Sequence, residues 1–325
     1  MNGYDAYVVK TRNKINERIS NSAYKAYLKP FANHMNTLAD NTKLNYIVFV
    51  DEFLSDTKKK PEELTMEDYD NFMVKKSEYV SGHQVLAYHA LSHFAEYMYA
   101  SDKANKNLMQ YVRRPKFKES RETISKREKG YLTEDEIKKF LNNVRNGCGN
   151  DLAKAKQKDW VERDMCLMLV ALTTGLRCAG LFKLDVDDID FENNTITVVD
   201  KGDKIQEYNI AENILPYIID WLAKREKFAS ADEKALFVSN RGTRMTSGSI
   251  YACVKKYSAN IEGKSISPHK LRASYGTALY EKTHDIYFVS KAMGHAGVEV
   301  TKRYIRGKDN QIRKDAAVFM NSVVG

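Results

Sequence analysis

Four short stretches of this chain carry residue types that could do chemistry together. The first contains Arg177, which closely follows Gly175 at the end of an apolar segment, and the glycine permits a sharp exit from a helix. An arginine so close to an apolar helix is desolvated unless an anionic group meets it. Two partners stay open: an aspartate within 185–190, or a phosphate, which the planar guanidinium grips with two hydrogen bonds.

The next two stretches add lysines and a histidine–arginine pair. Lys201 and Lys204 lie at an expected turn, where lysines are ordinarily solvated but where a flexible stem can also deliver a proton donor into a site. His269 and Arg272 are three residues apart, so they share a face of a helix that begins at Pro268. Anions bind readily at such a helix start, although a structural His–Arg pair is the simpler interpretation of this motif alone.

The fourth stretch, GHAGVEVTKRY, places His295 nine residues before Tyr304. Lys302, Arg303 and Arg306 surround the tyrosine, and these cations suit a phenol that is held near an anion. One tyrosine among 20 would ordinarily belong to a core or a surface, so this stretch alone does not distinguish a catalytic from a structural role.

The composition fits a folded protein with an anionic partner. The 325 residues suggest two domains, and a hydrophobic fraction of 43% is enough for real cores. A formal charge of +9 favours nucleic acid first and an anionic membrane surface second, with plain solubility charge as the alternative. The longest apolar run, Cys166–Leu172, is too short to span a bilayer, and no signal peptide is recognised. The four cysteines share no CxxC spacing, so neither a disulfide framework nor a zinc site is expected, and a reducing cytoplasm fits.

Residues 1–112 are expected to be almost wholly helical. Helix starts are predicted at Asn41 as an N-cap, at a capping box that begins with Thr65, and at Ser81. Aromatic side chains are frequent here and are interpreted as core, with a base-stacking surface as the alternative. Residues 113–129 are predicted to be a linker with eight basic and three acidic side chains, either a solvated charge run or a segment that follows a phosphate backbone.

The remaining part combines helices with a short β region. A second capping box at Thr133 starts a helix, and the polar stretch 146–159, with two glycines, is expected to be a loop. Val161–Thr173 is apolar on most faces and predicts a buried helix. Thr195–Val199 and Ile205–Ile210 flank a glycine-containing turn and predict a hairpin. The fold class is therefore mainly α with a small antiparallel β-sheet.

The order of the four stretches along the chain is more informative than any one of them alone. The chain offers an arginine in T-G-L-R, a hairpin lysine in K-G-x-K, H-x-L-R, G-H and then a tyrosine, and this order resembles the tyrosine recombinase (phage integrase, Xer-like) family over roughly residues 130–310. The resemblance implies six catalytic residues, with Lys204 as a second candidate for the lysine: Arg177, Lys201, His269, Arg272, His295 and the nucleophile Tyr304.

The resemblance also implies an architecture and an activity. A helical core-binding domain at 1–112 and the linker at 113–129 would clamp duplex DNA together with an α+β catalytic domain at 130–325. The enzyme would cut and rejoin DNA at short inverted-repeat core sites through a 3′-phosphotyrosyl intermediate and a Holliday junction, for a mobile element or for integration and excision. It would need no metal and no other cofactor, and no membrane partner is expected.

Further expectations concern partners. A homotetramer on DNA is implied, with the C-terminal segment 305–325 docking on a neighbouring protomer or, as the alternative, on its own domain. Cations of the linker and the hairpin are expected to bind DNA phosphates, namely Arg113, Arg114, Lys116, Lys118 and Lys204.

The sequence departs from the family pattern at several positions. Gly180 stands where an acidic residue usually follows the first arginine, which leaves open how Arg177 is braced. Ala273, Met293 and Arg306 are further departures, and none of them removes a catalytic group. A type IB topoisomerase, which shares the tyrosine chemistry, and a catalytically idle DNA-binding protein are the rival hypotheses.

Overall fold

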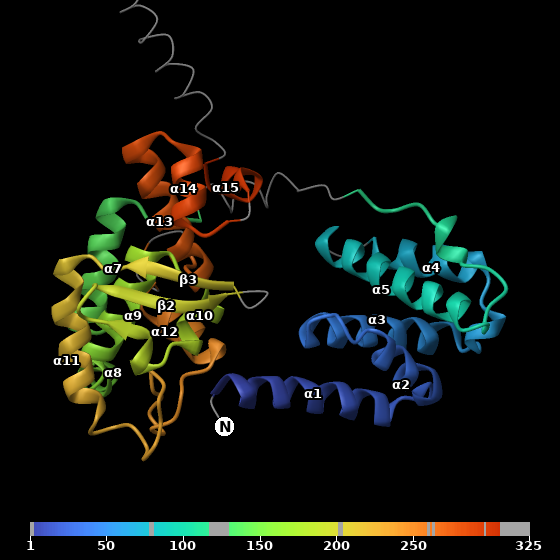
Figure 1. Ribbon diagram of the computed structural model, residues 1–325, viewed down its shortest axis with the longest axis horizontal. Helices are drawn as coiled ribbons and strands as arrows, with labels where there is room; N and C mark the ends of the chain where they lie inside the picture. The colour runs from blue at the N-terminus through green and yellow to red at the C-terminus, as the bar shows by residue number, and fades with distance from the viewer. Residues whose placement is uncertain are drawn as a thin grey trace, which may run out of the picture. The chain divides into compact units, whose positions relative to one another are not determined.

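Each of the two units of the chain has its own hydrophobic core in the described residues, and a smaller cluster lies in the C-terminal helices. The computed structural model describes residues 3–77, 81–116, 130–200, 204–258, 261, 264–295 and 297–305, without the side chains at 3–7, 81, 200, 204 and 303–305. The chain splits into unit 1, Met1–Ser120, and unit 2, Arg121–Gly325 (Figure 1). None of the helices in the described residues combines the length and the apolar character that a membrane crossing requires.

Unit 1 is built from helices around an aromatic core. Phe31, Phe53 and Phe94 are completely buried, and the rings of Phe31 and Phe94 meet edge to face with centroids 5.2 Å apart. Such pairs add to the hydrophobic stabilisation of a core. The helices of this unit are α1 Gly3–Asn21, α2 Lys25–His34, α3 Asp40–Thr57, α4 Met66–Lys76 and α5 Ser81–Ala100, with short 3-10 helices at Pro61–Glu63 and Leu108–Gln110.

Local capping decides where several helices begin. The Thr65 box is confirmed, because its hydroxyl accepts from the Asp68 amide while the Asp68 carboxylate accepts from the Thr65 amide at 2.8 Å. The box at Thr133 is confirmed in the same way. The start predicted at Asn41 is wrong: Ala39 is the N-cap of α3, and Asp40 in the first turn binds the side chain of Arg12.

Unit 2 is organised around a buried helix, α9 Val161–Thr174, close to the predicted 161–173. It contacts α7 Glu134–Asn146, α11 Leu215–Arg225 and α13 Pro268–Thr283 (Figure 1). The loop predicted at 146–159 is partly wrong. Its second half forms α8 Asp151–Lys158, because Asn150 caps the helix by accepting from the Ala153 amide at 2.9 Å, and Ala, Lys and Gln favour helix.

The predicted hairpin is confirmed as β2 Thr195–Asp200 and β3 Lys204–Asn209, and its tip at 201–203 lies outside the described residues. A two-residue strand, β1 Ile189–Asp190, pairs with the start of β2 and completes an antiparallel sheet in the order β1-β2-β3. Ile196 and Val198 point into the core, where α10 Cys178–Lys183 packs on β2.

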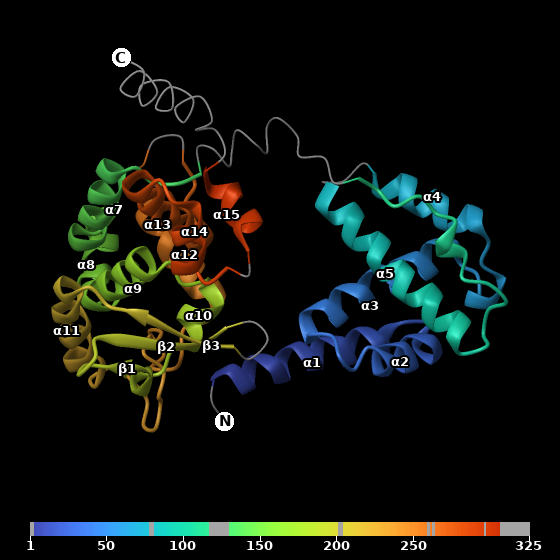
Figure 2. The same ribbon diagram turned by 45° about the horizontal axis from the view of Figure 1, so that its top comes forward.

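The C-terminal helices of unit 2 form a small cluster. Helix α13 begins with Pro268 at its first position, as expected. Helices α14 Ile286–Ala292 and α15 Val298–Ile305 pack on α13 and on each other (Figure 2). Helix α12 Ser247–Ser258 and the 3-10 helices at Val186–Asp188 and Glu212–Ile214 complete the unit. This arrangement brings the end of α9, the start of α13 and the turn after α14 together.

Candidate functional site

A buried arginine links three of the sequence motifs. Arg272 lies on α13 with only 1% of its surface exposed. Its Nη1 donates to the Gly175 carbonyl at 2.5 Å, and its Nη2 donates to the Met293 carbonyl at 2.5 Å. These carbonyls stand two residues before Arg177 and His295. One guanidinium therefore holds the end of α9 and the turn after α14 against the start of α13.

Arg177 enters this region through a sharp reversal of the chain. Gly175 ends α9 with φ +63°, a backbone conformation that glycine adopts at little cost, and Arg177 is the N-cap of α10. The ring of Tyr275 packs on the glycine so closely that a Cβ at position 175 would lie 2.3 Å from its Cδ1. A side chain at position 175 would therefore disturb the approach of α9 to α13.

The charges of both arginines act on His269. It sits in the first turn of α13 and keeps an exposed surface. Partial burial lowers the pKa of His269, and the positive charges of Arg272 and then Arg177 lower it further. The imidazole is therefore mostly neutral at pH 7, since its ordinary value is about 6.5. A neutral imidazole beside two guanidinium groups can accept a proton from a group held there.

His295 is buried and oriented by a hydroxyl on the last described helix. Its Nδ1 lies 2.8 Å from Oγ1 of Thr301, and its backbone amide donates to the Ser290 carbonyl at 2.9 Å. Thr301 belongs to α15, and Tyr304 belongs to the same helix three residues later. Positions three apart are neighbours on a helix surface. The backbone of Tyr304 is thus one turn beyond the residue that orients His295, and its side chain lies outside the described residues.

The predicted lysines and linker cations divide into two groups. Lys201 and Lys118 lie outside the described residues, and of Lys204 only the backbone, at the start of β3, is described. The other three, Arg113, Arg114 and Lys116, are exposed and line a pocket of about 430 Å³ in unit 1 beside α4.

The nearby aspartates are engaged with other groups. Asp185 binds Arg244, Asp188 accepts from the Asp185 amide at 2.8 Å, and Asp190 accepts from the Asn193 side chain at 2.7 Å. These contacts give the three carboxylates local structural roles. Within the described part of the chain, His, Cys, Asp and Glu side chains form no group of three or more that could hold a metal ion.

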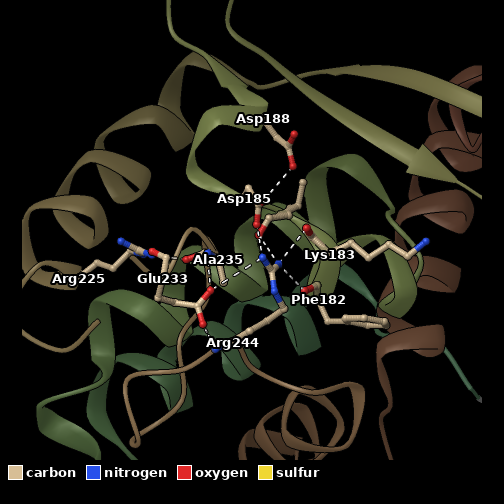
Figure 3. A network of polar contacts seen from close by, with 9 residues as sticks. Phe182, Lys183, Asp185, Asp188, Arg225, Glu233, Ala235 and Arg244 are labelled. Carbon is tan, nitrogen blue, oxygen red and sulfur yellow. Dashed lines mark hydrogen bonds and ion pairs between the residues drawn. The ribbon is translucent and has the colours of Figure 1, made fainter. Parts of the chain in front are cut away.

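A second arginine, whose side chain is mostly buried, braces α10, the helix that follows Arg177 (Figure 3). Arg244 is 8% exposed at its side chain, and its Nη1 donates to the carbonyls of Phe182, Lys183 and Leu184 at 2.9–3.0 Å. Its Nη2 binds Asp185. These contacts secure the C-terminal end of α10, where carbonyls otherwise lack partners.

The same network bears on the position of Gly180. A Cβ at Gly180 would lie 3.2 Å from Cγ1 of Val198, so α10 packs closely on β2, and a side chain at position 180 would require Val198 to shift by a few tenths of an ångström. Gly180 thus stands where the family has an acidic residue, and in this chain Arg244 braces the C-terminal end of the same helix, α10. The sequence alone does not mark Arg244 as a bracing residue, because its partners are 59 to 62 residues away along the chain.

Comparison with known proteins agrees with this arrangement. The phage integrase family matches residues 130–311, and the chain belongs to that family. Tyrosine recombinase XerC of Caldanaerobacter subterraneus subsp. tengcongensis is 33% identical over 229 residues, which cover 69% of this chain and 59% of the relative. Tyrosine recombinase XerC of Shewanella amazonensis is 39% identical over 144 residues, 44% of this chain and 48% of the relative. The chain thus spans about half to three fifths of the length of these curated relatives.

Solved structures show the same fold. The recombinase XerH bound to a palindromic difH substrate is 21% identical, with a TM-score of 0.65. The match covers 86% of this chain and 80% of the XerH chain. A lambda integrase dimer bound to a COC′ core site is 17% identical, with a TM-score of 0.64. The match covers 88% of this chain and 96% of the integrase chain. The family and the fold class predicted from the sequence are confirmed.

Proposed function

We propose that this protein is a site-specific recombinase that cuts and rejoins duplex DNA by transesterification. The observation that carries the proposal is the position of Arg272, which joins the Gly175 turn before Arg177 to the turn before His295. The influence of both arginines on the pKa of His269 supports a common site for these cations. The curated relatives are named tyrosine recombinases, which supports the same reaction class.

The arginines and His295 would act on the phosphate itself. A phosphodiester carries one negative charge, and its pentacoordinate transition state places more charge on the non-bridging oxygens. Arg177 and Arg272, held by the fold, would stabilise this added charge more than the charge of the ground state. His295, with its ring fixed through Thr301, would donate a hydrogen bond to the same phosphate.

His269, Tyr304 and Lys201 would move the protons. The Tyr304 hydroxyl, with an ordinary pKa near 10, would lose its proton to neutral His269 as its oxygen attacks phosphorus. The bond from phosphorus to the 5′ oxygen breaks, and Lys201 gives that oxygen a proton, a contribution of about 10²–10⁴ in rate. The phosphotyrosyl bond keeps the energy of the phosphodiester, so another 5′-hydroxyl can rejoin the strand without ATP.

The remaining parts of the chain would hold the DNA. Unit 1 is proposed as the core-binding domain, and Arg113, Arg114 and Lys116 as contacts to phosphates. The fold is shared with recombinases that were solved on a palindromic substrate and on a core site. We extend the proposal to a tetramer on paired inverted-repeat sites, with residues 305–325 reaching a neighbouring protomer.

A covalent-capture experiment tests the proposal. Host genomic fragments are incubated with the protein, denatured, and partitioned so that only protein-linked DNA is recovered and sequenced. The recovered site is then rebuilt as a nicked duplex that traps the cleaved intermediate. Wild type should form the adduct and Tyr304→Phe should form none. An idle DNA-binding protein would yield no adduct with either, and recovered sites without inverted repeats would favour a topoisomerase.

A further inference from the structure

A glutamine on the hairpin fills the space over the glycine that precedes His295. A Cβ built on Gly294 would lie 2.4 Å from Oε1 and 2.8 Å from Nε2 of Gln206. Gly294 also has φ +61°. Position 294 therefore favours glycine both because of its backbone conformation and because Gln206 leaves no space for a side chain. The Tyr208 hydroxyl donates to Oε1 of Gln206 at 2.8 Å and fixes the direction of the amide.

The position of Gln206 on its strand makes it a link between the hairpin and the rest of the unit. Gln206 pairs with Val198, and Val198 is buried, whereas the neighbouring Ile205 and Glu207 are exposed. Successive side chains point to opposite faces of a strand, so Gln206 belongs to the inward face. It lies three residues from the tip at 201–203, a strand length of about 10 Å.

The tip half of the hairpin has few other supports within the described sheet. Strand β1 pairs only with Ile196 and Thr195, at the end of β2 far from the tip. Beyond that point the described sheet is two-stranded, and a two-stranded hairpin is only marginally stable by itself. A side-chain contact at position 206 is therefore well placed to hold the described end of the hairpin, where β2 ends and β3 begins, against the rest of unit 2.

The other end of this contact is anchored in the site. The carbonyl of Met293, just before Gly294, accepts from Arg272, and His295, just after it, is bound through Nδ1 to Thr301. We propose that Gln206 is a positioning residue that seats the hairpin on the Gly294–His295 turn and so places Lys201 at the 5′ oxygen. This inference rests on the role proposed for Lys201 as the proton donor.

A change of leaving group tests this role. A thiolate leaves without protonation, because a thiol has a pKa near 8.5 and is far more acidic than an alcohol. The captured site is therefore made as two nicked duplexes, one with an ordinary phosphodiester and one with sulfur in place of the 5′ bridging oxygen. Gln206→Ala should slow single-turnover cleavage of the oxygen substrate by about 10-fold to 100-fold, the scale of a misplaced catalytic group, and leave the sulfur substrate near the wild-type rate.

Two further variants serve as controls for this result. Glu207→Ala, on the exposed face of the same strand, should cleave both substrates like wild type. Lys201→Ala should show the same pattern as Gln206→Ala, with a larger loss on oxygen. Equal slowing of Gln206→Ala on both substrates, or no slowing at all, would overturn the positioning role. Failure of sulfur to rescue Lys201→Ala would instead overturn the proton-donor assignment in the proposed function.

A double-mutant cycle tests the contact independently of the lysine. Because the contacting atoms end a flexible side chain, a methyl group in Gly294→Ala should displace the amide of Gln206. The rate losses of Gly294→Ala and Gln206→Ala on the oxygen substrate should therefore overlap, and the double variant should lose less than the product of the two factors. If the rate loss of the double variant equals the product of the two single losses, the amide of Gln206 and Gly294 act separately, which contradicts the inference.

Discussion

Gly175→Ala should destabilise unit 2 by removing the one residue type that suits the turn between α9 and Arg177. The backbone there has φ +63°, which costs a non-glycine residue about 1–2 kcal/mol. The new Cβ would also lie 2.3 Å and 2.8 Å from two ring carbons of Tyr275. Relieving such an overlap by shifting packed groups typically costs about 1–3 kcal/mol.

The two contributions together predict a loss of about 2–5 kcal/mol in the free energy of unfolding. The double variant Gly175→Ala/Tyr275→Ala separates them, since it removes the overlapping ring. Relative to Tyr275→Ala alone, the added alanine should then cost only the backbone part, about 1–2 kcal/mol. The Gly175 carbonyl also accepts from Arg272, so cleavage activity should fall more than stability alone explains.

Urea unfolding followed by tryptophan fluorescence measures this loss. Both tryptophans of the chain, Trp160 and Trp221, belong to unit 2, so the signal reports on the unit that contains Gly175. Gly297→Ala is the matched control, because a Cβ there meets no atom within 4 Å and its change should stay within about 0.5 kcal/mol. A loss below 1 kcal/mol in Gly175→Ala would refute the packing described at this turn.

Three further results are expected. Arg244→Met should cost unit 2 about 1–3 kcal/mol in urea unfolding, because it leaves the partly buried Asp185 and three carbonyls without their donor, and a near-neutral result would contradict the bracing of α10. Burial alone would raise the pKa of Asp164, but Arg163, Lys256 and Tyr257 lower it overall. The ionised Asp164 carboxylate therefore stabilises the folded state above the pKa of an unfolded aspartate, about 3.9. This stabilisation is lost as the pH falls through the lower pKa of the folded state. The acid-induced loss of stability should therefore shrink in Asp164→Asn, and an unchanged acid transition would count against this assignment. His269 has a lowered pKa, so single-turnover cleavage should decline only below about pH 6.5, and His269→Gln should lose that decline together with most of its rate.

Local sequence signals predicted the parts of the fold that depend on neighbouring residues. The capping boxes at Thr65 and Thr133, the apolar helix ending at Thr174 and the hairpin all follow from patterns within a few residues. Helix α8 carried a comparable signal in Asn150 and its Ala-, Lys- and Gln-rich segment, but two nearby glycines favoured a loop. Strand β1 has two residues, too few for any alternation to be recognised.

Contacts between distant segments could not be predicted in this way. Arg177 and Arg272 were expected in one site on the basis of motif order, whereas the carbonyls that hold Arg272 depend on tertiary packing. Gln206 and Arg244 are polar residues in ordinary sequence surroundings, and only the fold shows what they touch. Motif order therefore supplied candidate groups, and the described contacts supplied the residues that hold them in place.

The catalytic role of Tyr304 is tested by identifying the residue that carries the DNA. Covalent adduct trapped on the nicked duplex is digested with nuclease and protease, and the peptide that retains a nucleotide is sequenced by mass spectrometry. We expect a single modified tyrosine, Tyr304, linked through a 3′-phosphate. A nucleotide on another side chain, or a 5′-phosphate linkage, would contradict it.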